Sequence, residues 1–184
     1  MKIGLDLDDT LCKTKEMVEI KLKEYCEKNG LNIHDVYSND IEMEKFYDEK
    51  LEEIYRDVEV KKYAVDVVRR LKNKGNLIYI ITARGVKFKA DFDFYKITLE
   101  WLGSHNIEID GIITSCYGEN KVEVCKREKI DIMIESDPYN YKMLTTSGVV
   151  CLLFDDRDVV SLGKHDFNNW ISIEKYIEKY RKGN

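Results

Sequence analysis

The amino-terminal stretch, in which a short apolar run ends in a cluster of acids, most constrains what this chain can fold into. Residues 3–7 are mostly apolar, and Asp6, Asp8 and Asp9 are followed by Thr10. This pattern is typical of a buried parallel strand whose carboxyl end opens into a reaction site. Asp6 and Asp8 lie two residues apart, so in an extended chain their side chains point the same way. Two carboxylates that close repel each other unless a cation or a shared proton lies between them. The simpler alternative is a solvated polar turn, and the density of acids favours a site.

Four further apolar runs predict strands, and the amphipathic segments between them predict helices. The expected strands cover residues 77–81, 111–114, 130–134 and 149–154. The expected helices cover residues 63–74, 93–104, 120–129, 139–146 and 173–181. Strands that alternate with helices at this spacing imply a parallel sheet covered on both faces. The predicted fold class is therefore α/β, with a doubly wound parallel sheet of five strands.

The segment between the first strand and the next core helix is too long for a simple crossover. It contains helical patterns at residues 14–29 and 39–58. We therefore expect a small helical cap at residues 12–60, inserted over the site after the first strand. Residues 1–11 and 61–184 would form the α/β core domain.

Aromatic side chains on the second helix of this cap have two interpretations. Phe46, Tyr47 and Tyr55 lie on or beside its apolar face. They are either core residues of the cap, which is the commoner role of such a stripe, or part of a substrate pocket in which a ring stacks on the ligand.

The composition predicts a soluble protein whose chemistry uses oxygen ligands. The chain has 184 residues, a net charge of −5 and no apolar run that approaches a membrane span. Its five cysteines and three histidines are dispersed, which disfavours disulfides, zinc and a histidine-built metal site. The amino terminus enters a strand rather than a signal peptide, so a cytoplasmic location is expected. Lysine and arginine are scattered, so neither nucleic acid nor a membrane is an expected partner.

Three strand ends would bring their polar side chains to one edge of the sheet. These side chains are Asp6, Asp8 and Thr10 after the first strand, Thr82 and Arg84 after the second, and Glu135 and Asp137 after the fourth. Carboxylates beside a cation and a hydroxyl suit a hard divalent cation, with Mg²⁺ as the best candidate, next to a phosphate. Lys121 is the candidate for completing the charge balance. Arg84 either contacts phosphate or sugar, or anchors its loop to an acid.

The set of motifs resembles that of the haloacid-dehalogenase-type phosphohydrolases. Residues 6–10 resemble the first motif of that superfamily, and Thr82, Lys121 and residues 135–137 resemble the second, third and fourth in order. Within the superfamily, the chain is similar to the 5'(3')-deoxyribonucleotidase group in its expected cap and in several core segments. Those segments are residues 64–71, 81–84, 101–102 and 130–135.

The resemblance implies a phosphomonoesterase that works through a covalent aspartyl-phosphate. Asp6 would be the nucleophile, and Asp8 would protonate the leaving alkoxide and then deprotonate the hydrolytic water. Thr82 and Lys121, with Arg84 as a further candidate, would hold the phosphate oxygens. Mg²⁺ would lie between Asp6, the backbone carbonyl of Asp8 and an acid of the fourth motif.

The fourth motif departs from the pattern of the group. There the strand usually ends in two adjacent acids, the second of which often binds the metal, but here the second position is Ser136. We expect Glu135 to bind the metal, with Asp137 assisting.

The leading hypothesis is a Mg²⁺-dependent phosphatase that hydrolyses a small phosphate monoester. A (deoxy)nucleoside monophosphate is the expected substrate, and another small phosphate, such as a sugar phosphate, is the alternative. A weaker alternative is a nucleotide-binding protein of the same fold that has lost turnover through the change at Ser136.

Overall fold

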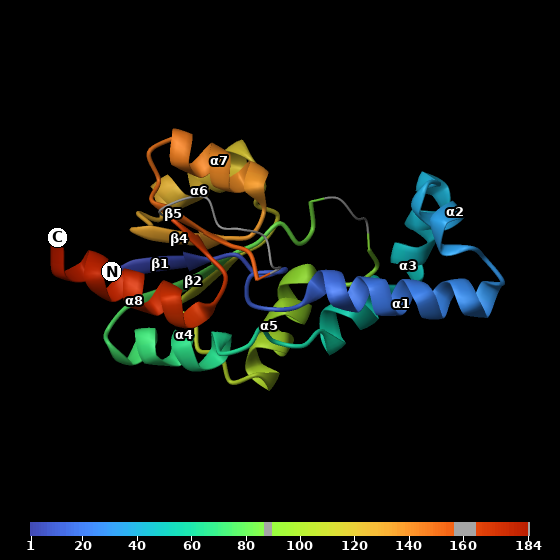
Figure 1. Cartoon of the computed structure of the whole chain (residues 1–184), viewed down its shortest axis with the longest axis horizontal. Helices are drawn as coiled ribbons and strands as arrows, with labels where there is room; N and C mark the ends of the chain where they lie inside the picture. The colour runs from blue at the N-terminus through green and yellow to red at the C-terminus, as the bar shows by residue number, and fades with distance from the viewer. Residues whose placement is uncertain (87–89, 157–164, 184) are drawn as a thin grey trace.

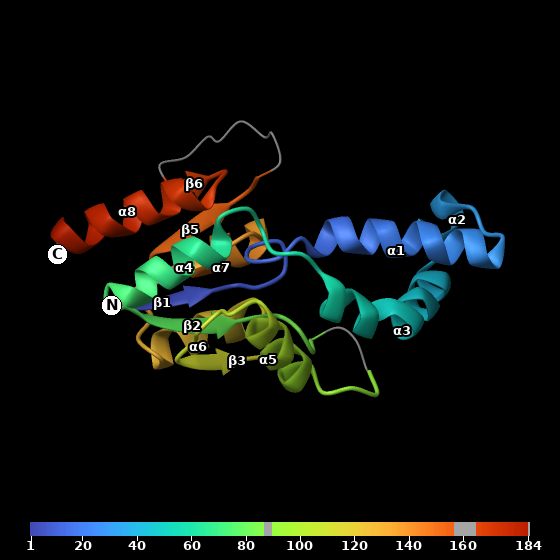
Figure 2. The ribbon, with the colours of Figure 1, turned by 90° about the horizontal axis from the view of Figure 1, so that it is seen from below.

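A sheet flanked by helices forms one part of the molecule, and a group of three helices extends from one end of it (Figure 1, Figure 2). The computed structural model describes residues 1–86, 90–156 and 165–183. The paired strands run parallel, and helices cover both faces of the sheet. The predicted α/β class and the doubly wound parallel sheet are therefore confirmed.

The sheet of the described residues has six strands, in the spatial order β3-β2-β1-β4-β5-β6. The strands are β1 (Lys2–Leu5), β2 (Leu77–Ile81), β3 (Gly111–Ile113), β4 (Ile132–Glu135), β5 (Cys151–Phe154) and β6 (Asp166–Phe167). The sequence predicts only five, because the two residues of β6 include an acid and form no apolar run. β1 lies between β2 and β4, so the carboxyl ends of three neighbouring strands surround the acids that follow it.

The two faces of the sheet carry different helices. The core under one face includes residues of α4 (Ala64–Asn73), α5 (Phe94–Ser104) and α8 (Trp170–Gly183), and that under the other includes residues of α6 (Glu119–Arg127) and α7 (Pro138–Thr146). Ile3 and Leu5 are fully buried in the first core. Gly4 points the other way, towards Met133 in the second core. The alternation along β1 is that of a central strand buried on both faces.

Three helices outside the sheet share a core of their own. They are α1 (Thr14–Asn29), α2 (Ile33–Tyr37) and α3 (Asp40–Asp57). The side chain of Asn39 caps α3 by accepting from the backbone N–H groups of Ile41 and Glu42. The buried residues of this core are Leu22, Tyr25, Cys26, Val36, Phe46, Leu51, Ile54 and Tyr55, joined by Ile97 of α5. Because α5 contributes to it, the helical group packs onto the sheet domain.

Two chain segments that run side by side connect the helical group to the sheet. The backbone N–H of Lys13 donates to the Glu59 carbonyl at 2.9 Å, and that of Lys61 donates to the Leu11 carbonyl at 2.7 Å. Two adjacent connecting segments are what an inserted cap would need, because the chain would leave the core and return to it at the same place. The division of the chain into a core and a cap at residues 12–60 stays a prediction.

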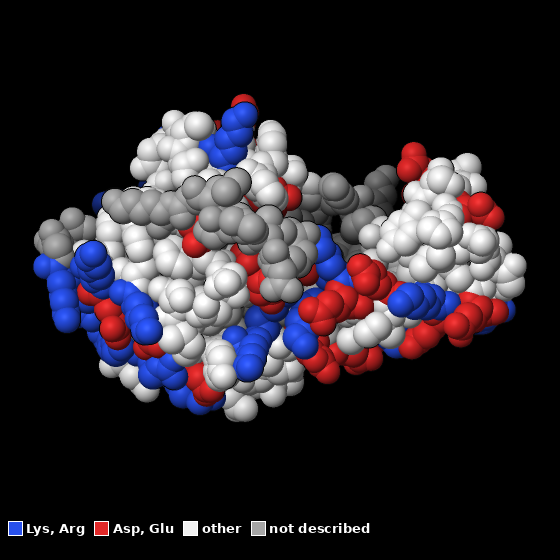
Figure 3. All heavy atoms as spheres, viewed as in Figure 1, with Lys and Arg blue, Asp and Glu red and all other residues white. Residues whose placement is uncertain are grey.

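Acidic and basic side chains are intermixed along the outer face of α1 (Figure 3). Lys21 pairs with Glu24 and with Glu53 of α3, and Lys28 pairs with Glu49. Lys28 and Glu24 are exposed, whereas Lys21 and Glu53 are half-buried; ion pairs at a surface contribute roughly 0–1 kcal/mol each. Within the described ranges, the helices are all too short or too polar to cross a membrane.

The closest packing at the centre of the sheet is at Gly4. A Cβ atom added there would lie 2.7 Å from Met133 Sδ and 3.1 Å from Ile130 Cγ2. We expect Gly4→Ala to lower the free energy of unfolding by about 1–3 kcal/mol, the usual cost of overpacking. Urea denaturation measures the change.

The matched control is Gly103→Ala in α5, where nothing lies within 4 Å of the added carbon. Replacing a helical glycine there should raise the free energy of unfolding, by up to about 1 kcal/mol. Equal effects of the two substitutions would contradict the packing described for β1.

Candidate active site

A buried lysine lies between two buried acids at the centre of the sheet edge. β1 and β4 are neighbours, with Leu5 opposite Ile134, so Asp6 directly after β1 lies next to Glu135 at the end of β4. Lys121, in the first turn of α6, donates from Nζ to Asp6 Oδ1 at 2.9 Å and to Glu135 Oε2 at 2.6 Å. Lys121 is 0% exposed, Asp6 6% and Glu135 1%. Residues more than a hundred positions apart in the sequence are thus held in one hydrogen-bonded group.

One ammonium shared by two carboxylates sets the protonation of this group. Burial, followed by the charge of Glu135, raises the pKa of Asp6 to about 7, although Lys121 acts in the opposite direction. Burial alone would lower the pKa of Lys121, but the charges of Asp6 and Glu135 raise it above its ordinary value. Lys121 therefore stays charged at neutral pH and can attract an anion to Asp6.

Asp8 lies on the tight turn that follows Asp6. Asp9 takes a positive φ of 60°, a conformation that aspartate tolerates better than most residues. The turn brings Thr10 back, so that its hydroxyl donates to Asp6 Oδ2 at 3.2 Å. The nucleophile candidate is therefore fixed through both carboxylate oxygens.

The carboxylate of Asp8 is bound by a buried arginine. Arg84 donates to Asp8 Oδ1 from Nη2 at 2.8 Å and to Asp8 Oδ2 from Nε at 3.1 Å, and the Thr14 hydroxyl donates to Oδ1 at 2.6 Å. Burial alone would raise the pKa of Asp8, but the charge and hydrogen bonds of Arg84, with the bond from Thr14, lower it. Of the two roles left open for Arg84, the structure shows the anchoring of its loop to an acid.

Thr82 lies one residue beyond β2, at the same edge of the sheet. It is fully buried, and its hydroxyl accepts from the backbone N–H of Arg84 at 3.3 Å. β2 pairs with β1, with Leu5 opposite Ile80. Thr82 therefore lies at the same edge of the sheet as the acids that follow β1. The phosphate-binding roles of Thr82, Lys121 and Arg84 stay predictions.

The two acids at the end of β4 and just beyond it accept hydrogen bonds from nearby backbone N–H groups. Glu135 Oε1 accepts from the backbone N–H groups of Ser136 and Asp137, each at 3.0 Å. Asp137 Oδ1 caps α7 by accepting from the N–H groups of Tyr139 at 2.8 Å and Asn140 at 2.9 Å. Glu135 and Asp137 stay predictions as metal ligands, and in this arrangement each already has a structural role.

Ser136 is the residue of this loop whose side chain turns towards the first motif. Its hydroxyl donates to the backbone carbonyl of Asp8 at 3.1 Å. The Asp6 carboxylate, the Asp8 carbonyl and the Ser136 hydroxyl are hard oxygen donors, which Mg²⁺ accepts together with water. These residues therefore fit Mg²⁺, with a neutral oxygen at position 136. In the part of the chain that the structure describes, no group of three or more His, Cys, Asp or Glu side chains is arranged to hold an ion, so water and substrate would have to supply several ligands.

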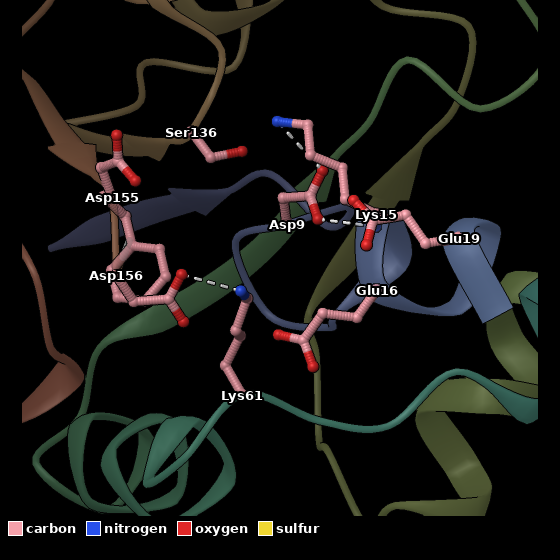
Figure 4. A pocket seen from close by; sticks show the side chains of 9 residues that line it. Asp9, Lys15, Glu16, Glu19, Lys61, Ser136, Asp155 and Asp156 are labelled. Carbon is pink, nitrogen blue, oxygen red and sulfur yellow. Dashed lines mark hydrogen bonds and ion pairs between the residues drawn. The ribbon is translucent and has the colours of Figure 1, made fainter. Parts of the chain in front are cut away.

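A cavity of about 310 Å³ opens beside Ser136, between the strand ends and the first turns of α1 (Figure 4). Its lining consists of Asp9, Lys15, Glu16, Glu19, Lys61, Ser136, Phe154, Asp155 and Asp156. Lys15 pairs with Asp9 at 3.4 Å, and Lys61 pairs with Asp156 at 2.8 Å. Most of the described residues in this lining are charged, with more acids than lysines, and the volume lies at the small end of the range for ligand sites.

Two of the three aromatic residues predicted for a substrate pocket are packed inside the molecule. Phe46 is 0% exposed, with its ring centroid 5.6 Å from that of Tyr25 and 5.1 Å from that of Tyr47. Tyr55 is 7% exposed, and the guanidinium carbon of Arg84 lies 3.9 Å from its ring centroid. The alternative interpretation, that these rings are core residues, describes Phe46 and Tyr55 in this conformation. Tyr47 is half-buried and lines a separate hollow on α3.

Sequence reasoning did not single out Thr14 or Lys61. Thr14 looks like an ordinary first residue of a helix, yet its hydroxyl contacts Asp8. Lys61 is 5% exposed and reaches Asp156, which lies 95 residues further along the chain. No local pattern marks such contacts, because they depend on how the helical group is joined to the sheet.

Removing the central lysine should destabilise the protein strongly. We expect Lys121→Met to lower the free energy of unfolding by about 3–5 kcal/mol at pH 7, because it leaves two buried carboxylates without their cation. Urea denaturation measures the loss. Lys126→Met, at an exposed position of the same helix, should change stability by no more than about 0.5 kcal/mol. Equal effects at the two positions would contradict the buried ion group.

Asp6 should make the stability of the metal-free protein depend on pH. Its pKa rises from 3.8 to about 7 on folding, so between these values the folded protein holds a proton that the unfolded chain has lost. This contribution to stability is present below about pH 4 and is lost as the pH rises towards 7.

The side chain that Asp6→Asn introduces cannot ionise. The free energy of unfolding of this variant, measured relative to that of the parent, should therefore increase as the pH rises from about 4 to 7. Urea denaturation of both proteins in EDTA, at several pH values, tests this. A difference that stays constant with pH would show that the pKa of Asp6 is not raised.

Known proteins resemble this chain over nearly its full length. No family model matches the sequence. A protein of Oceanobacillus iheyensis, provisionally described as a nucleotidase, is 25% identical over 91% of this chain and 97% of its own length. Among solved structures, a haloacid-dehalogenase-like (HAD) phosphatase from Thermococcus onnurineus matches with a TM-score of 0.66 at 13% identity, covering 96% of this chain and 98% of its own.

Two further structures agree with this result. A HAD-like hydrolase from Streptococcus pneumoniae has a TM-score of 0.65 at 11% identity and covers 96% of this chain and 97% of its own. A Bacillus subtilis protein provisionally assigned as a HAD hydrolase, solved with bound magnesium, has a TM-score of 0.71 at 12% identity and covers 96% of this chain and 98% of its own. At such low identity these structures establish the fold alone. The chain has the HAD-like hydrolase fold.

Proposed function

We propose that this protein is a phosphomonoesterase that forms a covalent phosphoryl intermediate on Asp6. The observation that carries the proposal is the buried group at the end of β1, where Lys121 and Thr10 hold the two oxygens of the Asp6 carboxylate. A fixed carboxylate beside a buried ammonium suits attack on a phosphate, because the ammonium offsets the repulsion between the two anions. The HAD phosphatase of the same fold from Thermococcus onnurineus supports this choice of reaction.

The chemistry would proceed in two steps. In the first, an Asp6 oxygen attacks phosphorus, the bond from phosphorus to the leaving oxygen breaks, and the leaving oxygen takes a proton from Asp8. In the second, water attacks the phosphoryl group on Asp6, the bond between phosphorus and the Asp6 oxygen breaks to free inorganic phosphate, and Asp8 takes a proton from that water. Arg84 lowers the pKa of Asp8 in this structure, which favours the ionised form that the second step requires. The proton that Asp8 donates in the first step would be the one that it took from water in the preceding turnover. Lys121 and Thr82 are proposed to hold the phosphate oxygens.

Mg²⁺ is proposed as the cofactor. Asp6, the carbonyl of Asp8 and the hydroxyl of Ser136 would hold it, and when bound it would supply positive charge between the carboxylate and the phosphate. The magnesium-bound Bacillus subtilis structure of the same fold supports this proposal.

A (deoxy)nucleoside monophosphate is the proposed substrate, on the strength of the Oceanobacillus iheyensis relative. The charged side chains around the cavity beside Ser136 favour the second candidate, a sugar phosphate, because carboxylates and lysines bind hydroxyl groups well and Phe154 is the single aromatic residue among the described residues of its lining. In both cases the partner is a small phosphorylated molecule rather than a nucleic acid or a membrane, and a cytoplasmic location is proposed for such a reaction.

A phosphate-release screen over nucleoside monophosphates and sugar phosphates, with Mg²⁺ and with EDTA, tests this proposal. We expect release with Mg²⁺ and little without it. Asp6→Asn should lower kcat by at least about 10³-fold, because it removes the nucleophile. Asp66→Asn, at an exposed position of α4, is the control and should keep full activity. If the parent releases no phosphate from either class of substrate, the proposed function is wrong.

A further inference from the structure

A buried arginine joins the helical group to the candidate acid–base residue. Arg84 is 1% exposed, and its Nε and Nη2 atoms contact the two oxygens of Asp8 as a fork. A forked contact fixes the direction of a carboxylate as well as its charge. Besides the hydrogen bond from the Thr14 hydroxyl, the position of Asp8 therefore depends on what holds the guanidinium of Arg84.

Tyr55, near the end of α3, packs against that guanidinium. The guanidinium carbon lies 3.9 Å from the centroid of the Tyr55 ring. Phe92 and Phe94 pack against the same ring, with centroids 6.4 Å and 6.2 Å away. Tyr55 is 7% exposed, so its ring is held in place and the contact with the cation is shielded from water. A cation–π contact in such a setting is stronger than one at an exposed site.

Two weaker contacts of the guanidinium come from other described residues. Nη1 donates to the Thr98 hydroxyl of α5 at 3.4 Å, and Nη2 lies 3.8 Å from Cys12 Sγ. Thr98 hydrogen-bonds at 2.7 Å to its own helix, through the Phe94 carbonyl. Among these neighbours, Tyr55 belongs to the three-helix group, and its ring packs against the guanidinium.

We propose that Arg84 is a positioning residue for Asp8, and that the ring of Tyr55 keeps the guanidinium of Arg84 in place. The helical group thereby sets the position of the carboxylate that moves the proton. This inference rests on the proposed function, in which Asp8 acts in both chemical steps. It gives Tyr55 a role through Arg84, in place of the predicted contact with a substrate ring.

The test compares three variants by phosphate release, using the best substrate of the screen. Tyr55→Leu removes the ring face and should lower kcat by about 10- to 100-fold with little change in KM, since a misplaced proton-transfer group slows the chemical step. Tyr55→Phe keeps the ring face and should retain kcat within about threefold. A difference between these two variants shows that the aromatic face is what matters.

Ile54→Ala is the control for a general loss of packing in the helical group. Ile54 is 0% exposed and belongs to the same apolar core as Tyr55. The substitution should lower the thermal unfolding temperature at least as much as Tyr55→Leu does, yet keep kcat. A merely structural role for Tyr55 would make kcat follow the loss of stability in both variants.

The outcomes separate this inference from the proposed function. If the parent is active and Tyr55→Leu keeps its kcat, or if Tyr55→Phe loses as much as Tyr55→Leu, the positioning role is wrong and the phosphatase proposal stands. If the parent releases no phosphate from any substrate, the proposed function fails and this inference fails with it.

Discussion

The shared hydrogen bonding of Lys121 to Asp6 and Glu135 is the interaction on which the arrangement of the site depends. A buried carboxylate without a partner would lose its charge or destabilise the fold, and here one ammonium serves two of them. The sheet makes this possible, because parallel pairing of β1 with β4 sets Asp6 and Glu135 side by side and α6 begins above them. The same contact leaves the group one positive charge short, so binding of a divalent cation or uptake of a proton would be favourable there.

Asp8 differs from Asp6 in what surrounds it. Asp6 accepts a hydrogen bond from Lys121, which also donates to Glu135. Asp8 accepts two hydrogen bonds from the guanidinium of Arg84. Their pKa values are moved in opposite directions, upward for Asp6 and downward for Asp8. Two neighbouring carboxylates with different protonation behaviour suit two different roles in one reaction.

The regular part of this structure could be predicted from the sequence, and the contacts between distant elements could not. The apolar runs gave β1, β2, β4 and β5 to within a few residues, because buried parallel strands are continuously apolar. β6 gave no such signal. At the site, the motif residues were found by their position after strands, but the sequence could not show that Arg84 turns to Asp8 or that Ser136 reaches the Asp8 carbonyl. Phe46 and Tyr55 illustrate the same limit, since an aromatic stripe on a helix looks alike whether it faces a ligand or a core.

The central claim is that the phosphoryl group passes through Asp6, and acid-quenched mass spectrometry tests it most directly. The protein would be mixed with Mg²⁺ and its best substrate, quenched during turnover, digested and analysed for phosphorylated peptides. The account predicts one phosphoryl group on the peptide that contains Asp6 and none on that peptide in Asp6→Asn. Phosphate release by the parent with the phosphoryl group on another residue, or with undiminished turnover in Asp6→Asn, would contradict it.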